Sequence, residues 1–249
     1  MLDLSLGRWI LAAASSFLVG LSKTGIPGLG VLAAPLFAGV MPARASTGAF
    51  LPLLIIGDLF AVAAYRRHAV WSHLLRLIPW ALGGIVAGYL IMGRISDDQL
   101  RPLLGIAVLA ILALGTWRDL KRGVEAAIPT QWWFAALIGL LAGMMTMLTN
   151  AAGPIMLVYL LAMRLPKNAF LGTSGWYFLI LNCVKVPFSI SLGLITPQSL
   201  VLDLALSGVV IAGAIAGLLA AKRIPEKAFT IIVKILALAV GLNLIIGVV

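Results

Sequence analysis

The sequence predicts an all-α polytopic membrane protein with two homologous repeats, and three observations carry this prediction. Of the 249 residues, 62% are hydrophobic and only 10% are charged, whereas soluble domains carry roughly 25% charged residues. Apolar segments long enough to cross a bilayer recur along the whole chain, without the alternating pattern of barrel strands. The two halves also resemble each other weakly. Because lipid-exposed backbone must form its hydrogen bonds internally, we expect these segments to be helices.

Each half is expected to contain a first helix, a break, a short apolar segment and then three longer helices. The N-terminal segment 1–21 lacks the basic start of a signal peptide, so we interpret it as a retained membrane span. Segments 29–40 and 154–163 are too short to cross about 30 Å of hydrocarbon, so they are interpreted as half-helices or re-entrant segments. In total we expect about 8–10 membrane helices, with one broken or short helix in each half.

The resemblance between the halves emerges when the chain is compared with itself at a fixed offset. An offset of 124 positions places Asp58 on Asn182 and Gly48 on Gly172. Internal repeats of this kind are common in membrane transporters. We therefore expect one membrane domain in three parts, namely a first transmembrane repeat, a basic cytoplasmic linker and a second repeat, at residues 1–122, 123–131 and 132–249.

The basic residues behind the net charge of +10 lie in short loops between apolar segments. Such a placement is typical of cytoplasmic loops in membrane proteins, so we expect no nucleic-acid partner. Loops at matching positions of the two halves differ in basic content, which favours repeats that are inverted relative to each other. The loops expected in the cytoplasm are 66–71, 118–130, 164–167 and 222–227.

Two interruptions of the apolar pattern occur at corresponding positions of the halves, "GLSKTGIPGLG" at 20–30 and "TMLTNAAGP" at 146–154. Glycine permits unusual backbone angles and proline ends a helix, so new helices are expected to begin near Leu29 and Ile155. The unpaired N–H groups of these helices attract an anion, and Lys23 adds a full positive charge. Broken helices at matching positions of two repeats predict a binding site between the halves.

The candidate site combines residues of both breaks with polar residues of the following helices. The substrate-binding candidates are Lys23, Thr24, Gly25, Pro27, Gly28, Gly30, Thr149, Asn150, Gly153, Pro154, Thr173, Asn182 and Lys185. An intramembrane carboxylate is a functional candidate by default, so Asp58 is the candidate for proton coupling. The sequence contains no cluster of a nucleophile, a base and metal ligands, so we expect neither an enzyme nor a metal or other cofactor.

Several of these assignments have structural alternatives. Glycine-rich breaks can serve tight helix packing alone, and Lys23 can be an interfacial residue whose charge reaches the membrane surface. Asp58 can form a static ion pair instead of binding a coupling proton, and Lys185 is a plausible partner for it. Small hydroxyl residues can line the cavity or only pack between helices; those in question are Thr47, Thr173 and Ser174.

Segments 20–42 and 146–188 resemble the two signatures of the sulfite exporter TauE/SafE family, also called the toluene sulfonate uptake permease family. The resemblance covers about a quarter of the chain in these signatures, and the two-repeat layout is similar too. Only the two loops 23–30 and 149–154 are assigned to the site on the basis of this resemblance. The second break reads "TNAAGP", which departs from the glycine-rich form that many members have, so the exact substrate stays open.

This resemblance implies a multi-pass transporter in the bacterial inner (plasma) membrane that carries sulfur-containing anions such as sulfite, organosulfonates or sulfoacetate. It also implies the proton as the coupling ion. Together with the predicted repeats, it favours a secondary transporter that works by alternating access. The expected partners are the anion and membrane lipid, and a homodimer is possible. The alternatives are an uptake permease for another organic anion, a passive anion channel and a membrane assembly factor.

Overall fold

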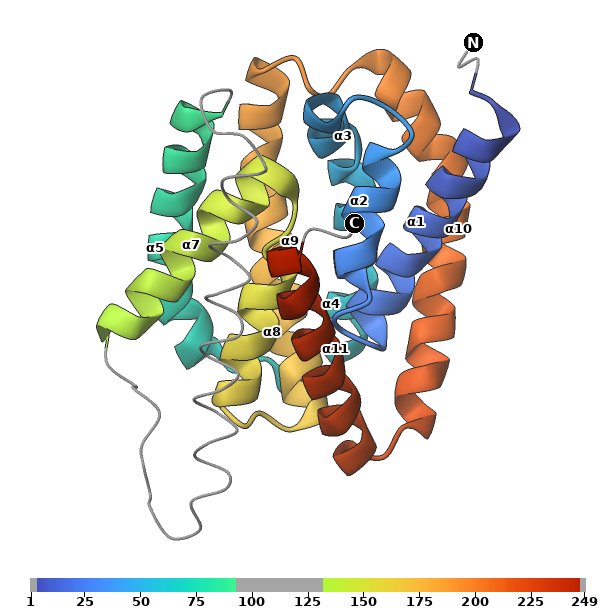
Figure 1. Cartoon of the computed structure of the whole chain (residues 1–249). Helices are drawn as coiled ribbons and strands as arrows, with labels where there is room; N and C mark the ends of the chain where they lie inside the picture. Colours follow the sequence, from blue (N-terminus) through green and yellow to red (C-terminus); the bar gives the residue numbers. More distant parts are fainter. Residues whose placement is uncertain (1–3, 93–131, 247–249) are drawn as a thin grey trace, which may run out of the picture.

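The computed structural model is a bundle of helices in which residues 4–92 and 132–246 are described (Figure 1). The first half contains α1 (Leu6–Thr24), α2 (Gly30–Ala38), α3 (Ala43–Ala49), α4 (Leu51–Tyr65), the 3-10 turn η1 (Arg66–His68) and α5 (Trp71–Ile91). The second half contains α7 (Trp132–Thr149), α8 (Gly153–Ala162), α9 (Lys167–Ser191), α10 (Pro197–Arg223) and α11 (Glu226–Ile246). The described residues form no strand, and the predicted all-α class is confirmed.

Five described segments are long and apolar enough to cross a membrane, which confirms the prediction of a polytopic membrane protein. They are Arg44–His68, Trp71–Ile91, Trp132–Thr149, Lys167–Ser191 and Pro197–Arg223. The two segments expected to be short are short: α2 has 9 residues and α8 has 10. At 1.5 Å per residue each reaches about half of a bilayer core. The predicted linker 123–131 lies outside the described residues.

Helices of the two halves pack against each other in pairs: α1 on α10, α5 on α7 and α4 on α9. In Figure 1, α1 runs downward from the N-terminus whereas α7 runs upward, and α5 runs upward whereas α10 runs downward. Helices at matching positions along the two halves therefore run in opposite directions. The division into two inverted repeats stays a prediction.

Glycines allow two of these helix pairs to approach closely. A Cβ at Gly20 of α1 would collide with the α10 backbone at Val210 and Ala214, and a Cβ at Gly143 of α7 would collide with the α5 backbone at Ala81. Small residues are the usual means by which membrane helices gain close packing. The α1–α10 and α5–α7 pairs are therefore two tightly packed units.

The basic turns gather at one end of the molecule, the lower end in Figure 1. The Lys167 Nζ at the start of α9 donates hydrogen bonds of 2.8 Å to the carbonyl oxygens of Ala221 and Ile224 at the end of α10. The turn after α4 carries Arg66 and Arg67 at the same end. Three of the four loops expected in the cytoplasm thus lie together; the fourth, 118–130, lies outside the described residues.

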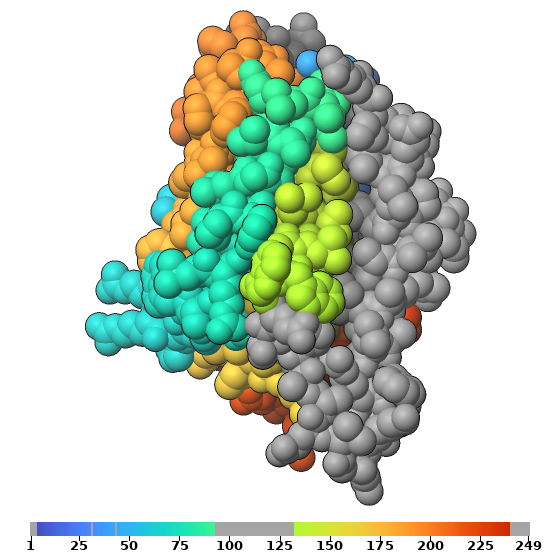
Figure 2. Space-filling view, turned by 90° about the vertical axis from the view of Figure 1, so that its left-hand side faces the viewer, coloured from blue at the N-terminus to red at the C-terminus, as the bar shows by residue number. Residues whose placement is uncertain are grey.

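The helices α5 and α7 together form one face of the molecule, which Figure 2 shows. Large hydrophobic side chains that lie exposed on it include Leu75, Leu90 and Leu137. The tryptophans Trp71 and Trp132 lie at the starts of α5 and α7, and both are exposed. Aromatic residues at helix ends are typical of membrane–water interfaces, so this surface fits contact with lipid.

Candidate functional site

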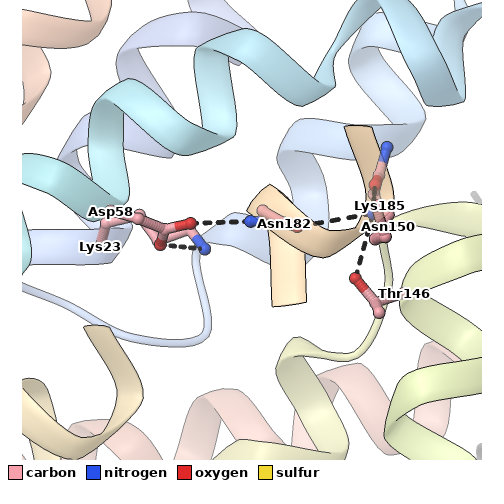
Figure 3. Close-up of polar contacts among 6 residues, drawn as sticks. All are labelled: Lys23, Asp58, Thr146, Asn150, Asn182 and Lys185. Carbon is pink, nitrogen blue, oxygen red and sulfur yellow. Dashed lines mark hydrogen bonds and ion pairs between the residues drawn. The ribbon is translucent and has the colours of Figure 1, made fainter. Parts of the chain in front are cut away.

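The interior of the bundle contains an ion pair between the first break and α4. The Lys23 Nζ lies 2.7 Å from the Asp58 Oδ1, and the carboxylate is fully buried. The Nδ2 of Asn182, on α9, donates a hydrogen bond of 2.7 Å to the Asp58 Oδ2 (Figure 3). One oxygen of this carboxylate thus lies beside the Lys23 ammonium and the other accepts a hydrogen bond, and a neighbouring cation of this kind is how a buried charge is stabilised in an apolar interior.

The ion-pair partner of Asp58 is therefore Lys23, and the alternative of a direct pair with Lys185 is wrong. Lys185 reaches Asp58 only through Asn182, because its Nζ lies 3.5 Å from the Asn182 Oδ1. Asn182 and Lys185 share one face of α9, as their three-residue spacing indicates, but the side-chain amide stands between the two charges. The ion pair also does not fit Lys23 as an interfacial residue.

Lys185 is itself fully buried. Its Nζ also donates hydrogen bonds to the Asn150 Oδ1 at 2.5 Å and to the Thr146 Oγ1 at 3.2 Å. With the Asn182 oxygen this makes three oxygen acceptors, matching the three N–H donors of an ammonium group. None of the three acceptors carries a charge. The geometry therefore fits a protonated lysine whose charge has no carboxylate in direct contact.

Asn150 connects this cluster to the second break. Its φ of 58° lies in the left-handed region, which asparagine tolerates better than most residues. Its Nδ2 donates a hydrogen bond of 2.8 Å to the Thr47 carbonyl oxygen on α3, and the Thr47 hydroxyl donates one of 3.4 Å to the Leu148 carbonyl. A continuous polar chain thus runs from Lys23 at the first break to Asn150 at the second (Figure 3).

Both breaks line one cavity of about 70 Å³. Lys23, Gly28 and Gly30 come from the first break, and Asn150 and Gly153 from the second. Gly30 and Gly153 are the first residues of α2 and α8, so the cavity meets two helix N-termini whose first N–H groups have no intrahelical partner. The cavity can hold a small group, because one water needs only about 10–15 Å³ of such space.

Lys23 is the cation that faces this cavity. Its side chain is 14% exposed, whereas that of Asp58 is 0% exposed, and Asp58 is not among the lining residues. The Lys23 Nζ also lies 4.0 Å from the ring centroid of Phe178, in cation–π geometry. The ammonium group therefore has the carboxylate behind it, an aromatic ring beside it and the cavity in front.

The structure brings about half of the predicted site residues to the cavity. Those that line it are Lys23, Pro27, Gly28, Gly30, Asn150, Gly153 and Asn182. Asp58 and Lys185 lie one layer behind, in contact with lining residues. Thr24, Gly25, Thr149, Pro154 and Thr173 are not among the lining residues.

The predicted hydroxyls that miss the cavity form structural hydrogen bonds instead. The Thr24 hydroxyl donates to the Ala214 carbonyl on α10 at 2.7 Å. Thr149 donates to the carbonyl one turn earlier, and Thr173 accepts from the backbone N–H of Val70 at 2.9 Å. Gly25 packs against the backbone of Gly217, where a side chain would not fit. Of the hydroxyls left open, Ser174 lines the cavity and Thr47 anchors the second break.

Among the lining residues that the sequence analysis did not select are Ser22, Thr146 and Phe178. Ser22 precedes Lys23 directly, and Thr146 lies one turn before Asn150, so helical spacing from the breaks could have identified both. Phe178 lies four residues before Asn182 and thus on the same face of α9. An apolar residue in an apolar helix, however, has no sequence signal of its own.

Residues 12–244 match the family described as sulfite exporter TauE/SafE, so the chain belongs to this family. The match covers nearly the whole chain, which extends the resemblance of the two signatures to all described helices. No match was found among curated proteins or among solved structures. The family and the five membrane-spanning segments establish a multi-pass membrane protein of a family that transports sulfite and related sulfur anions, for which a bacterial inner membrane is the fitting location.

Proposed function

From family membership and the cavity, we propose that this protein is a secondary transporter that binds a small sulfur-containing anion between its two breaks and moves it by alternating access. One observation carries the proposal: both breaks and the cavity-facing lysine line the same enclosed space. Two matching breaks that meet at one cavity are the arrangement expected of a substrate site in a transporter with internal repeats.

The charges around the cavity favour an anion. Lys23 and Lys185 supply two ammonium groups, and Asp58 supplies one carboxylate, so the cluster has one excess positive charge. An uncompensated charge is costly in an apolar interior, and a bound anion would compensate it. The N-termini of α2 and α8 add positive dipole ends at the cavity. The apolar wall at Phe178 would suit the organic part of a sulfonate.

The packing of the helices supports alternating access. The α1–α10 and α5–α7 pairs are tightly packed units, and each joins a helix of the first half with one of the second. Between them lie α4 and α9, which carry Asp58, Asn182 and Lys185. Movement of the two units against each other would open the cavity to one side and then to the other. Opposite directions of matching helices agree with an inverted repeat.

We propose Asp58 as the residue that couples a proton to the anion. A proton on its carboxylate would remove the charge that holds the Lys23 ammonium 2.7 Å away. Lys23 would then be free to interact with the anion alone, so proton and anion would bind together. If the pair is instead static, Asp58 only orients Lys23, and flux does not depend on the pH gradient.

A thermal-shift screen of the purified protein tests the site. The ligands are sulfite, sulfate, thiosulfate and alkyl sulfonates. At a ligand concentration of 100 times Kd, binding stabilises the folded state by about 2.7 kcal/mol. Lys23→Met is expected to lose this shift, whereas Lys222→Met, which removes an exposed lysine at the basic end, retains it. The site is refuted if no anion stabilises the wild type, or if Lys23→Met shifts as much as the wild type.

Flux measurements in proteoliposomes separate the proposed carrier from its competitors. A carrier saturates with anion concentration, a channel passes current without saturation at modest concentrations, and an assembly factor shows no anion-dependent stabilisation. With proton coupling through Asp58, Asp58→Asn abolishes flux driven by a pH gradient while anion exchange persists. Equal pH-driven flux in both proteins would exclude the proton role of Asp58.

A further inference from the structure

A second acidic residue lies inside the membrane region, on α10, and the anion site does not use it. Asp203 is 3% exposed, and neither of its carboxyl oxygens has a hydrogen-bond partner among the described residues. Within the five membrane-spanning segments, Asp58 and Asp203 are the acidic residues. They contrast sharply, because Asp58 has a lysine on one oxygen and an amide on the other.

The helices around Asp203 provide no visible counter-charge. α10 packs mainly on α1, α4 and α3. The charged or titratable side chains of those helices are Arg8, Lys23, Arg44, Asp58 and Tyr65. Arg8 and Arg44 are exposed. Lys23 is engaged with Asp58, and the Tyr65 hydroxyl donates to the Thr24 carbonyl at 2.9 Å. On α10 itself, Lys222 lies 19 residues further along, about 28 Å away.

An ionised carboxylate in such surroundings is far more costly than a neutral carboxylic acid. We propose that Asp203 binds a proton in this conformation and is a proton-binding site of the transporter, separate from the Lys23–Asp58 pair. The inference rests on the proposed transport function. In this conformation Asp58 is ionised, since Lys23 compensates its negative charge. Asp203, which has no such partner, carries a proton instead.

The position of Asp203 connects it to the anion site. It belongs to the face of α10 that also carries Gly213 and Ala214, and a Cβ at Gly213 would collide with the backbone of Phe17 on α1. Further along the same interface, the Thr24 hydroxyl bonds to Ala214, and Thr24 directly follows Lys23. A displacement of α10 therefore also displaces the α1 end that holds the anion-binding lysine.

Asp203 lies in the second turn of α10, about 16 Å along the helix axis from Ala214. This end of α10 is opposite the basic turn at 222–227, on the side expected to face out of the cell. Loss of the proton would leave an unpaired, buried charge on α10, the helix that packs tightly on α1. A conformation that exposes Asp203 to water would then be favoured. Because α10 and α1 move together, release of the proton would be coupled to the movement of α1.

Infrared spectroscopy of the purified full chain tests the protonation state directly. The wild type is expected to show the C=O band of a protonated carboxylic acid at neutral pH. Asp203→Asn removes this band and Asp58→Asn retains it. Since asparagine resembles the neutral acid in shape, Asp203→Asn should leave the melting temperature near that of the wild type. A band that survives Asp203→Asn, or a marked rise in melting temperature, would overturn the proposal, because an ionised unpaired carboxylate gains from neutralisation.

Transport in proteoliposomes tests the role of the proton. Asp203→Asn is expected to lose accumulation of the anion that a pH gradient drives, and Asp203→Glu to recover it with a displaced pH profile. Glu226→Gln, which removes an acid at the basic end, is the matched control and keeps pH-driven accumulation. Wild-type accumulation by Asp203→Asn refutes the proton site. Absence of any anion-induced thermal shift in the wild type instead refutes the proposed function. The infrared band does not depend on anion binding, so the two outcomes can be distinguished.

Discussion

Removing either member of the Lys23–Asp58 pair should destabilise the protein, and by different amounts. Loss of one partner of a buried ion pair costs about 3–5 kcal/mol, because the remaining charge is uncompensated. Lys23→Met leaves a fully buried carboxylate with only the Asn182 amide, so the cost should lie near the upper limit of about 5 kcal/mol. Asp58→Asn leaves an ammonium group that still faces the cavity and Phe178, so about 3 kcal/mol is expected.

The double variant Lys23→Met/Asp58→Asn removes both charges and leaves neither side chain unpaired. Replacement of a whole buried pair by neutral groups is often close to neutral, so we expect stability within about 1 kcal/mol of the wild type. The interaction energy between the two substitutions in a double-mutant cycle would then be large, as for residues in direct contact.

Thermal unfolding in detergent measures these differences. For a chain of this size, 1 kcal/mol corresponds to about 2–4 °C in Tm, so Asp58→Asn should lower Tm by about 6–12 °C. Lys222→Met, which removes an exposed lysine, is the control and should stay within about 0.5 kcal/mol of the wild type. Single variants as stable as the wild type, or a double variant that loses the sum of both, would refute a buried ion pair.

Three further substitutions probe the site. Lys185→Met removes the excess positive charge and should abolish the anion-induced thermal shift; an unchanged shift would exclude this lysine from anion binding. Gly28→Ala places a side chain at a φ of 106° and should lower the free energy of unfolding by at least about 1–2 kcal/mol. Its control is Gly208→Ala, at an exposed position within a helix, which should raise the free energy of unfolding by up to about 1 kcal/mol. Phe178→Leu removes the ring beside the cavity-facing ammonium and should weaken anion affinity by about 0.5–1 kcal/mol, measured by titration.

The breaks were predictable because glycine and proline constrain the backbone directly. The short helices α2 and α8 begin within two residues of the positions expected from "GIPGLG" and "NAAGP". The correspondence of Asp58 and Asn182 was also visible, since the offset between the halves places one on the other, although no contact between them was predicted. Both features depend on local sequence or on repetition, which a single chain records.

Other contacts depend on how helices pack, and the sequence does not record that. Two lysines could have paired with Asp58, and only the position of α1 against α4 selects Lys23. Thr24 and Thr173 have the same hydroxyl chemistry as a ligand-binding residue, yet each is used to join helices. Asp203 lies in an apolar segment with no motif around it, and its importance becomes visible only when its lack of a partner is known.

Under the proposed function, the charge on Asp58 should also select the charge of the anion. With Asp58 ionised, the cluster has one excess positive charge and is neutralised by a monovalent anion. With Asp58 protonated, the excess is two charges, and a divalent anion neutralises it. Asp58→Asn imitates the protonated state. In thermal-shift titrations we therefore expect the wild type to prefer methanesulfonate and Asp58→Asn to prefer the similarly sized sulfate. The same preference in both proteins would show that Asp58 does not set the charge of the site.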